Sequence, residues 1–188
     1  MLILCTNAKN FENRIFIYDS PSWPGKEVRN QDSIQGMVPG SLTDDYDIRI
    51  YTDGSRMDGG VGSGVFCHEL GIRDSHRLPD GCSVFQAEVF AVMAACRAMH
   101  GRDSLGSIGI FVDSQAAILA LNSYTTTSSL VEECKQELSR LSCLSVITLV
   151  WVPAHRDYYG NERADELARR EPLWISLVWN QSEYPWHP

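Results

Sequence analysis

The sequence predicts an α/β fold in which a mixed, five-stranded sheet carries helices on its faces. Two features lead to this prediction. Three strand-like runs over residues 47–78 are separated only by short turn signals, which is typical of an antiparallel meander. Apolar runs and segments of helical periodicity then alternate over residues 85–170, as expected where strands are joined through helices. The predicted order is strand, strand, strand, helix, strand, helix, helix, strand and helix.

The three opening strands begin the regular part of the chain. In Asp47–Thr52, the apolar residues Ile48 and Ile50 alternate with polar and aromatic neighbours, which is the period of a half-buried strand. The glycine-rich run Gly59–Leu70 and the run Ile72–Leu78 follow it. We expect tight turns at the glycines between these runs.

In the later part of the chain, segments in which apolar residues recur every three to four residues alternate with short apolar runs. The predicted elements are a helix over Phe85–Met99, a strand over Ile108–Val112, a helix over Ser114–Leu121, a helix marked by Leu130–Leu141, a strand over Val146–Val152 and a helix over Gly160–Arg170. Asn161, near the start of the last helix, is a residue suited to capping it.

Composition limits the classes of function. The 188 residues suffice for one ordinary domain, and 24 acidic against 16 basic side chains give a net charge of -8. This balance disfavours a protein that binds nucleic acid through charge alone, but it allows an enzyme whose carboxylates hold metal ions. The six cysteines lack CxxC spacing, which argues against a zinc finger. We expect an intracellular protein, cytoplasmic or nuclear and not secreted, with no membrane partner.

The chain divides into three parts by composition. Residues 46–171 form the predicted domain. Residues 1–45 are rich in proline and glycine, with one clear strand candidate at Arg14–Tyr18, and we interpret them as an N-terminal extension or linker. Residues 172–188 form a C-terminal tail without usable periodicity.

Four carboxylates occupy places where sites assemble in α/β sheets. Asp53 follows the first strand at an expected turn into Gly54, and Asp113 ends the fourth strand. Glu88 lies early in the first helix and Asp165 one turn into the last. Gathered together, these groups would repel one another without a counter-charge, so they predict a site for hard divalent cations. Two such ions about 4 Å apart can activate a water and stabilise the leaving oxygen of a phosphodiester.

Each carboxylate, taken alone, also has a purely structural interpretation. Asp53 is typical of a hairpin turn, and a glutamate such as Glu88 usually lies on a solvated helix face. Asp113 suits the N-cap of the following helix, and Asp165 can pair with Arg169 four residues on. The four together are more specific than any one of them.

Five short segments, four of which carry these carboxylates, follow one another in an order that resembles a known family. The segments are Tyr51-Thr-Asp-Gly-Ser55, Gln86-Ala-Glu88, Val112-Asp-Ser-Gln115, Trp151-Val-Pro-Ala-His155 and Gly160-Asn-Glu-Arg-Ala-Asp-Glu-Leu-Ala168. They are similar to the type 1 ribonuclease H domain over about residues 47–170. In detail they look like the domain found in the polyproteins of non-LTR retrotransposons.

The resemblance implies an endonuclease that hydrolyses the RNA strand of RNA–DNA hybrids with two Mg²⁺ ions, for which Mn²⁺ can substitute. It implies that Asp53, Glu88, Asp113 and Asp165 are the metal ligands and that His155, which completes the catalytic set, assists proton transfer. An imidazole exchanges protons near neutral pH, which suits that role. The predicted contacts with the nucleic acid are made by Gly54, Ser55 and Ser83.

Two other functional interpretations stay open at this stage. The first is a non-catalytic, decayed retroelement fragment that keeps the fold, which the low basic content and the apolar pair Val84-Phe85 before Glu88 favour. The second is a different nuclease of the same fold. The leading hypothesis is the RNA–DNA hybrid ribonuclease, with a reverse-transcriptase domain as a further partner.

Overall fold

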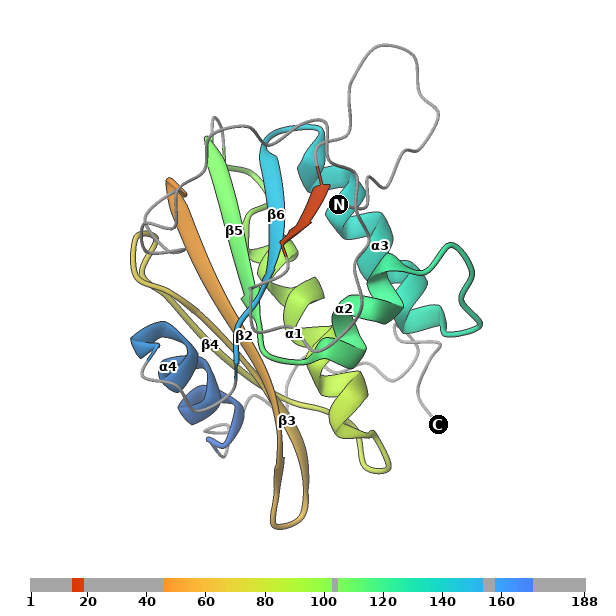
Figure 1. The fold of residues 1–188 in the computed structure, drawn as a ribbon. Coiled ribbons are helices and arrows are strands. Elements are labelled where there is room, and N and C mark those ends of the chain that lie inside the picture. The colour runs from red at the N-terminus through yellow and green to blue at the C-terminus, as the bar shows by residue number, and fades with distance from the viewer. Residues whose placement is uncertain (1–14, 19–45, 103–104, 154–157, 171–188) are drawn as a thin grey trace.

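The computed structural model of the protein describes residues 15–18, 46–102, 105–153 and 158–170. A mixed sheet in the order β1-β6-β5-β2-β3-β4 forms its centre (Figure 1). The strands are β1 (Ile15–Tyr18), β2 (Ile48–Met57), β3 (Gly60–Cys67), β4 (Ile72–Arg77), β5 (Ser107–Val112) and β6 (Val146–Trp151). The helices are α1 (Val84–Ala98), α2 (Gln115–Asn122), α3 (Ser129–Ser142) and α4 (Tyr159–Ala168).

The predicted fold class is confirmed, and the sheet is mixed as expected. β2, β3 and β4 pair antiparallel, whereas β5 pairs parallel with both β2 and β6. The strand candidate at Arg14–Tyr18 forms β1, which pairs parallel with β6 and adds a sixth strand at that edge. All five strands of the predicted domain are present within the sheet.

One predicted turn is wrong. β2 does not turn at Asp53-Gly54 but continues to Met57, because its antiparallel pairing with β3 runs on to the pair Met57↔Gly60. The chain reverses at Asp58 and Gly59 instead. Gly59 has a φ of 92°, a backbone conformation that glycine adopts without steric cost. Asp53 therefore lies inside a long strand and not at its end.

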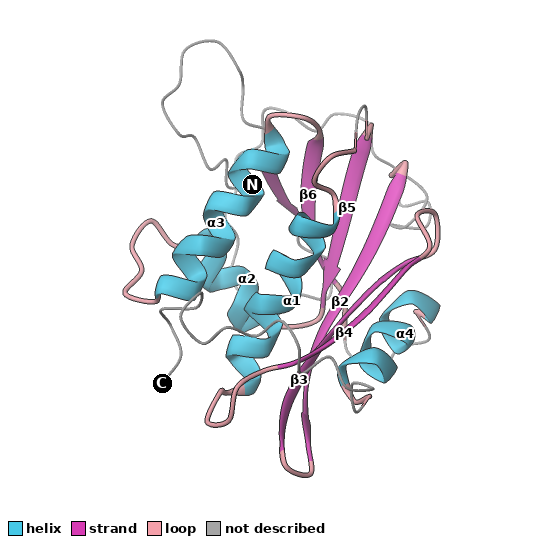
Figure 2. Ribbon diagram, turned by 180° about the vertical axis from the view of Figure 1, so that it is seen from behind, coloured by secondary structure: helices cyan, strands magenta, loops and turns pink. Residues whose placement is uncertain are grey.

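Helices cover the two faces of the sheet unequally (Figure 2). α1, α2 and α3 lie on one face, where the main apolar core gathers residues of every described central strand, such as Ile50, Ile110 and Leu149. On the other face α4 is the one helix among the described residues, and it lies against β2, β3 and β4. β3 shows the alternation that serves both sides, since Val65 joins the main core and Phe66 packs with α4.

Glycines in β3 allow α4 to lie very close to the sheet. A Cβ atom at Gly64 would overlap the carbonyl oxygen of Ala164, and one at Gly62 would overlap that of Ala168. Both contacts are with helix backbone, which cannot move aside as a flexible side chain can. The glycine-rich composition of β3 thus sets the height of α4 above the sheet, and with it the position of Asp165.

Candidate metal centre

Two of the predicted carboxylates project from neighbouring strands. β2 and β5 lie side by side, and their last paired residues are Thr52 and Val112. Asp53 and Asp113 each come one residue later, so they lie side by side where the parallel pairing of the two strands ends. The backbone of Asp113 is further held by Trp151, whose indole Nε1 donates a hydrogen bond to its carbonyl oxygen at 3.1 Å.

Glu88 reaches this edge from the helical layer. α1 begins after Ser83, whose hydroxyl accepts a hydrogen bond from the Gln86 backbone N–H, while the Gln86 side chain accepts one from the Ser83 N–H. The second turn of the helix then passes directly over Gly54. A Cβ atom there would lie 2.5 Å from the Glu88 backbone nitrogen. Gly54 also donates a backbone hydrogen bond to the Glu88 carboxylate, which orients it.

The three side chains converge. One carboxylate oxygen from each of Asp53, Glu88 and Asp113 lies within 4.8 Å of the others. Only 6% of Asp53 and 7% of Glu88 is exposed. A cavity of about 320 Å³ opens onto the cluster; its lining residues are Asp53, Gly54, Ser55, Glu88, Asp113, Tyr158, Asn161, Glu162, Asp165 and Arg169.

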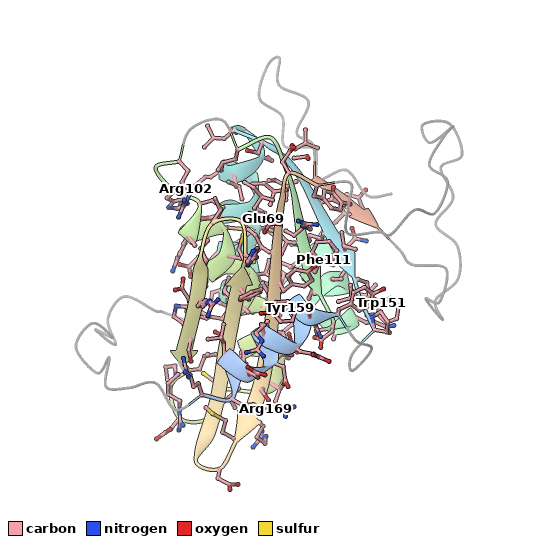
Figure 3. All side chains as sticks on the ribbon, turned by 90° about the vertical axis from the view of Figure 1, so that its left-hand side faces the viewer. Glu69, Arg102, Phe111, Trp151, Tyr159 and Arg169 are labelled. Atoms are coloured by element: carbon pink, nitrogen blue, oxygen red, sulfur yellow. The ribbon has the colours of Figure 1, made fainter. Side chains whose placement is uncertain are left out.

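Asp165 lies in the same cavity but outside the group of three. Its Oδ1 is 2.8 Å from Nη2 of Arg169, so the i,i+4 pair that the sequence allowed does form. Arg169 also donates a hydrogen bond from Nε to the Ser55 hydroxyl at 3.3 Å. Among the lining residues that the structure describes, Arg169 is the one cation beside five acidic side chains. Figure 3 shows Arg169 at the far end of α4 from Tyr159.

The structural interpretations of Asp113 as a helix cap and of Glu88 as a residue on a solvated helix face are wrong. Ser114, not Asp113, caps α2, since its hydroxyl accepts a hydrogen bond from the Ala117 N–H. Glu88 faces the interior and not solvent. Glu88 is therefore buried and Asp113 partly buried, and neither has a role in ending or solubilising a helix.

Asn161 has a different place from the predicted one. The N-cap of α4 is Tyr158, which makes no side-chain capping bond, and Asn161 lies two residues inside the helix. Its Nδ2 donates to Asp113 Oδ2 at 3.4 Å, and its buried Oδ1 has no hydrogen-bond partner among the described residues. The capping prediction is wrong because the chain enters the helix three residues earlier. Sequence reasoning missed Asn161 as a site residue; its signal was a polar side chain one turn before Asp165.

Burial and mutual repulsion hold protons on the cluster. Desolvation, reinforced by the charges of Asp113 and Asp165, raises the pKa of Asp53 to about 8, although Arg169 opposes the shift. Desolvation likewise raises the pKa of Glu88 to about 9, with Asp113 and Asp53 adding to it. Burial also raises the pKa of Asp113, against the hydrogen bond from Asn161. The protein's own charges thus leave the cluster under-compensated.

The donor atoms fit a hard divalent cation. Asp53 Oδ2 and Glu88 Oε2 are buried and accept no hydrogen bond from the described part of the chain. Unpaired buried carboxylate oxygens are costly, and oxygen ligands of this kind are what Mg²⁺ and similar ions prefer. A bound cation would satisfy these atoms and neutralise the repulsion between them.

The remaining predicted site residues divide into three cases. Gly54 and Ser55 line the cavity, as the predicted contacts require. Ser83 does not line it and uses its hydroxyl to cap α1. His155 lies outside the described residues. The contacts of Gly54, Ser55 and Ser83 with a substrate stay predictions.

Two further findings concern the chain as a whole. None of the described helices is long and apolar enough to cross a membrane. The sequence model of the RNase H family matches residues 45–172, which is more than half of the chain.

Proposed function

The chain belongs to the RNase H family, and on that premise we propose that it is an endonuclease that hydrolyses the RNA strand of RNA–DNA hybrids. The observation that carries this proposal is the convergence of Asp53, Glu88 and Asp113 where the parallel pairing of β2 and β5 ends, with an unpaired buried oxygen on both Asp53 and Glu88. Asp165 joins the same cavity from the last helix.

Asp53, Glu88 and Asp113 would hold the cations, with Asp165 as a fourth ligand once Arg169 releases it. Two divalent ions bound there would supply a water nucleophile and stabilise the leaving oxygen of the phosphodiester. Mg²⁺ is the proposed ion and Mn²⁺ a substitute, because both take oxygen ligands.

The chain's own residues prepare the cluster for this task. The Gly54 N–H fixes the direction of the Glu88 carboxylate, and the Asn161 amide does the same for Asp113. Hydrogen bonds of this kind to ligand oxygens orient them before an ion arrives. Burial excludes bulk water, which strengthens every charge interaction in the cavity.

His155 is proposed to carry a proton to or from the reacting groups, since imidazole titrates near neutral pH. Gly54 and Ser55 are the proposed contacts with the nucleic-acid backbone, and Ser83 is a third. Recognition of a hybrid through its shape and the 2′-hydroxyls of its RNA strand predicts little sequence preference.

The origin and setting of the domain are also proposals. The run Ser83-Val-Phe-Gln-Ala-Glu88 and the run Asp113-Ser-Gln-Ala-Ala117 support descent from a non-LTR retrotransposon, with a reverse-transcriptase domain as partner. We propose an intracellular location in the cytoplasm or nucleus. Five cysteines without a disulfide among the described residues are consistent with it.

The decisive experiment is cleavage of a labelled RNA–DNA hybrid by the purified protein with Mg²⁺, with Mn²⁺ and with EDTA. Duplex RNA and duplex DNA of the same sequence are the controls. We expect cutting of the RNA strand in the hybrid alone, and only with a metal. Folded protein that cuts nothing with either metal would contradict the proposal and favour the non-catalytic alternative, which the acidic composition also supports.

A further inference from the structure

The start of α4 presents aromatic and cationic side chains next to the carboxylate cavity. We call Tyr158, Tyr159 and Arg163 the α4 aromatic surface. Tyr158 lines the cavity itself and packs on the buried cluster of Phe111, Val150 and Val152. Tyr159 follows it directly, and 59% of it is exposed. Figure 3 shows Tyr159 at the start of the helix. The surface therefore begins at the cavity with Tyr158 and extends along α4 to Tyr159 and Arg163.

Two neighbours hold the exposed ring of Tyr159 in one orientation. Its edge meets the buried ring of Phe66 at 5.9 Å between centroids and an interplanar angle of 82°. The guanidinium of Arg163 lies over its face, 5.3 Å from the centroid. Both contacts are typical favourable arrangements of aromatic and cationic groups. An exposed aromatic ring that is already fixed loses little entropy when a ligand packs against it.

Two polar side chains of α4, Arg163 and Asn161, each have one buried atom without a hydrogen-bond partner among the described residues. Arg163 pairs through Nη1 with Glu166 at 2.8 Å, but its buried Nε has no hydrogen-bond partner within the described ranges. Asn161 lines the cavity with an Oδ1 that is likewise buried and unpartnered by any described residue. Arg163 therefore lies beside the Tyr159 ring, and Asn161 lies in the cavity that Tyr158 also lines.

We infer that the α4 aromatic surface receives the sugar–phosphate backbone of the nucleic-acid strand next to the phosphate that cations at the carboxylates would hold. This inference rests on the proposed function. In a hybrid duplex the bases are stacked on one another, so an aromatic ring outside the duplex meets sugars and not base faces. The ring of Tyr159 packs against a sugar, and Arg163 contacts a neighbouring phosphate.

The charge of the protein makes such local contacts important. With a net charge of -8, it gains little affinity from general attraction to phosphates. Affinity must then come from shape, packing and a few well-placed cations. The α4 aromatic surface supplies packing area and, in Arg163, a cation in addition to Arg169 near a cavity lined by five acidic side chains.

The test measures binding of an intact hybrid by fluorescence anisotropy, with every variant made in an Asp113→Asn background that does not cut. Tyr159→Ala is expected to weaken binding about five- to tenfold, because the packing area of the ring is lost. Tyr159→Phe keeps the ring and is expected to stay within about twofold of the parent. Arg163→Gln is expected to weaken binding. It should also reduce the slope of log affinity against log salt concentration by about the amount that one phosphate contact contributes.

Tyr124→Ala is the matched control, since Tyr124 is 86% exposed but lies between α2 and α3, on the other side of the sheet. It is expected to bind like the parent. Equal affinities for the parent and Tyr159→Ala, or an equal loss in Tyr124→Ala, would overturn the inference while leaving the proposed function intact. Thermal unfolding checks that each variant is folded. If Tyr159→Ala is not, Arg163→Gln decides, and an unchanged salt slope overturns the inference.

The parent itself separates this inference from the proposed function. If it binds the hybrid no better than duplex DNA, and the unmodified protein does not cut the hybrid, both proposals fail. If the unmodified protein cuts the hybrid and Tyr159→Ala binds it unchanged, only the α4 aromatic surface is overturned.

Discussion

Carboxylates are buried in two parts of this protein, and the protein treats them in opposite ways. Between α1 and α3, Glu137 is only 4% exposed but is surrounded by basic groups. Its carboxylate lies 3.0 Å from Arg140, 3.1 Å from His100 and 3.4 Å from Arg97. Asp53, Glu88 and Asp113 lie together where the pairing of β2 with β5 ends, and Arg169 is the counter-charge near them.

The difference separates a structural carboxylate from a functional cluster. A buried ion pair whose charges are matched holds two helices together and needs nothing from outside. A cluster of like charges with too little counter-charge costs free energy in the folded state, which a bound cation would offset. Burial alone therefore does not identify a site; burial without the chain's own counter-charges does.

The largest expected effect is on catalysis. Asp113→Asn should keep the fold but lower metal-dependent cleavage of the hybrid by at least about 100-fold, because a neutral amide is a poor ligand for a divalent ion. Asp58→Asn, in the exposed β2–β3 turn, is the matched control and should cleave normally. The measurement is the initial rate of RNA cleavage with saturating Mg²⁺. A rate near that of the original protein for Asp113→Asn would contradict the site assignment.

Neutralising a carboxylate should change the free energy of unfolding in opposite directions in the two buried regions. In metal-free protein at pH 8.5, Asp53→Asn removes repulsion and desolvation of a charge and should raise the free energy of unfolding by about 1–3 kcal/mol. Glu137→Gln removes the partner of two arginines and should lower it by a similar amount, about 1–3 kcal/mol. Urea unfolding measures both. If both substitutions change the free energy of unfolding in the same direction, the two regions do not differ in charge compensation.

The pH dependence of metal-free stability follows from the raised pKa values. Asp53 and Glu88 have pKa values near 8 and 9 in the folded protein, above the ordinary values of 3.8 and 4.5 that we assign to the unfolded chain. Between these limits the folded protein binds more protons, so its stability falls as pH rises from about 4 to about 9. Replacing both, in Asp53→Asn with Glu88→Gln, should flatten this fall.

Cation binding should show the complementary trend. Since carboxylates must lose their protons to bind a metal, the apparent affinity for Mg²⁺ should rise between pH 6 and pH 9, by up to about tenfold per pH unit for each proton released. Calorimetric titration in two buffers of different ionisation enthalpy measures both the affinity and the released protons. An affinity independent of pH would mean that the ion binds elsewhere.

The smallest expected effect concerns the residue that orients Asp113. Asn161→Ala should lower the affinity for Mn²⁺ about tenfold, as is typical for a hydrogen-bond partner of a metal ligand. Its matched control is Asn122→Ala, at the end of α2 on the other face of the sheet. Unchanged Mn²⁺ affinity in Asn161→Ala would show that the 3.4 Å contact with Asp113 is incidental.

Local pattern was enough for most elements of the fold. Periods of two and of 3.6 residues located the strands and helices, because side-chain burial on a sheet or a helix repeats with those periods. The pattern failed at Asp53-Gly54, where a turn-like dipeptide continues as strand because β3 supplies hydrogen bonds to it. It failed also at Asn161, whose capping propensity was overridden by an earlier helix start at Tyr159.

The sequence by itself determined the carboxylates of the candidate site, since their type and order along the elements can be recognised without coordinates. Tertiary structure decided how those groups are paired. It brought Asp53 and Asp113 to one edge, passed α1 over Gly54 so that Glu88 reaches them, and held Asp165 against Arg169. It also placed basic side chains around Glu137, a residue that the sequence does not distinguish from other glutamates. Charge compensation depends on distances between residues far apart in the chain, and these exist only once the chain is folded.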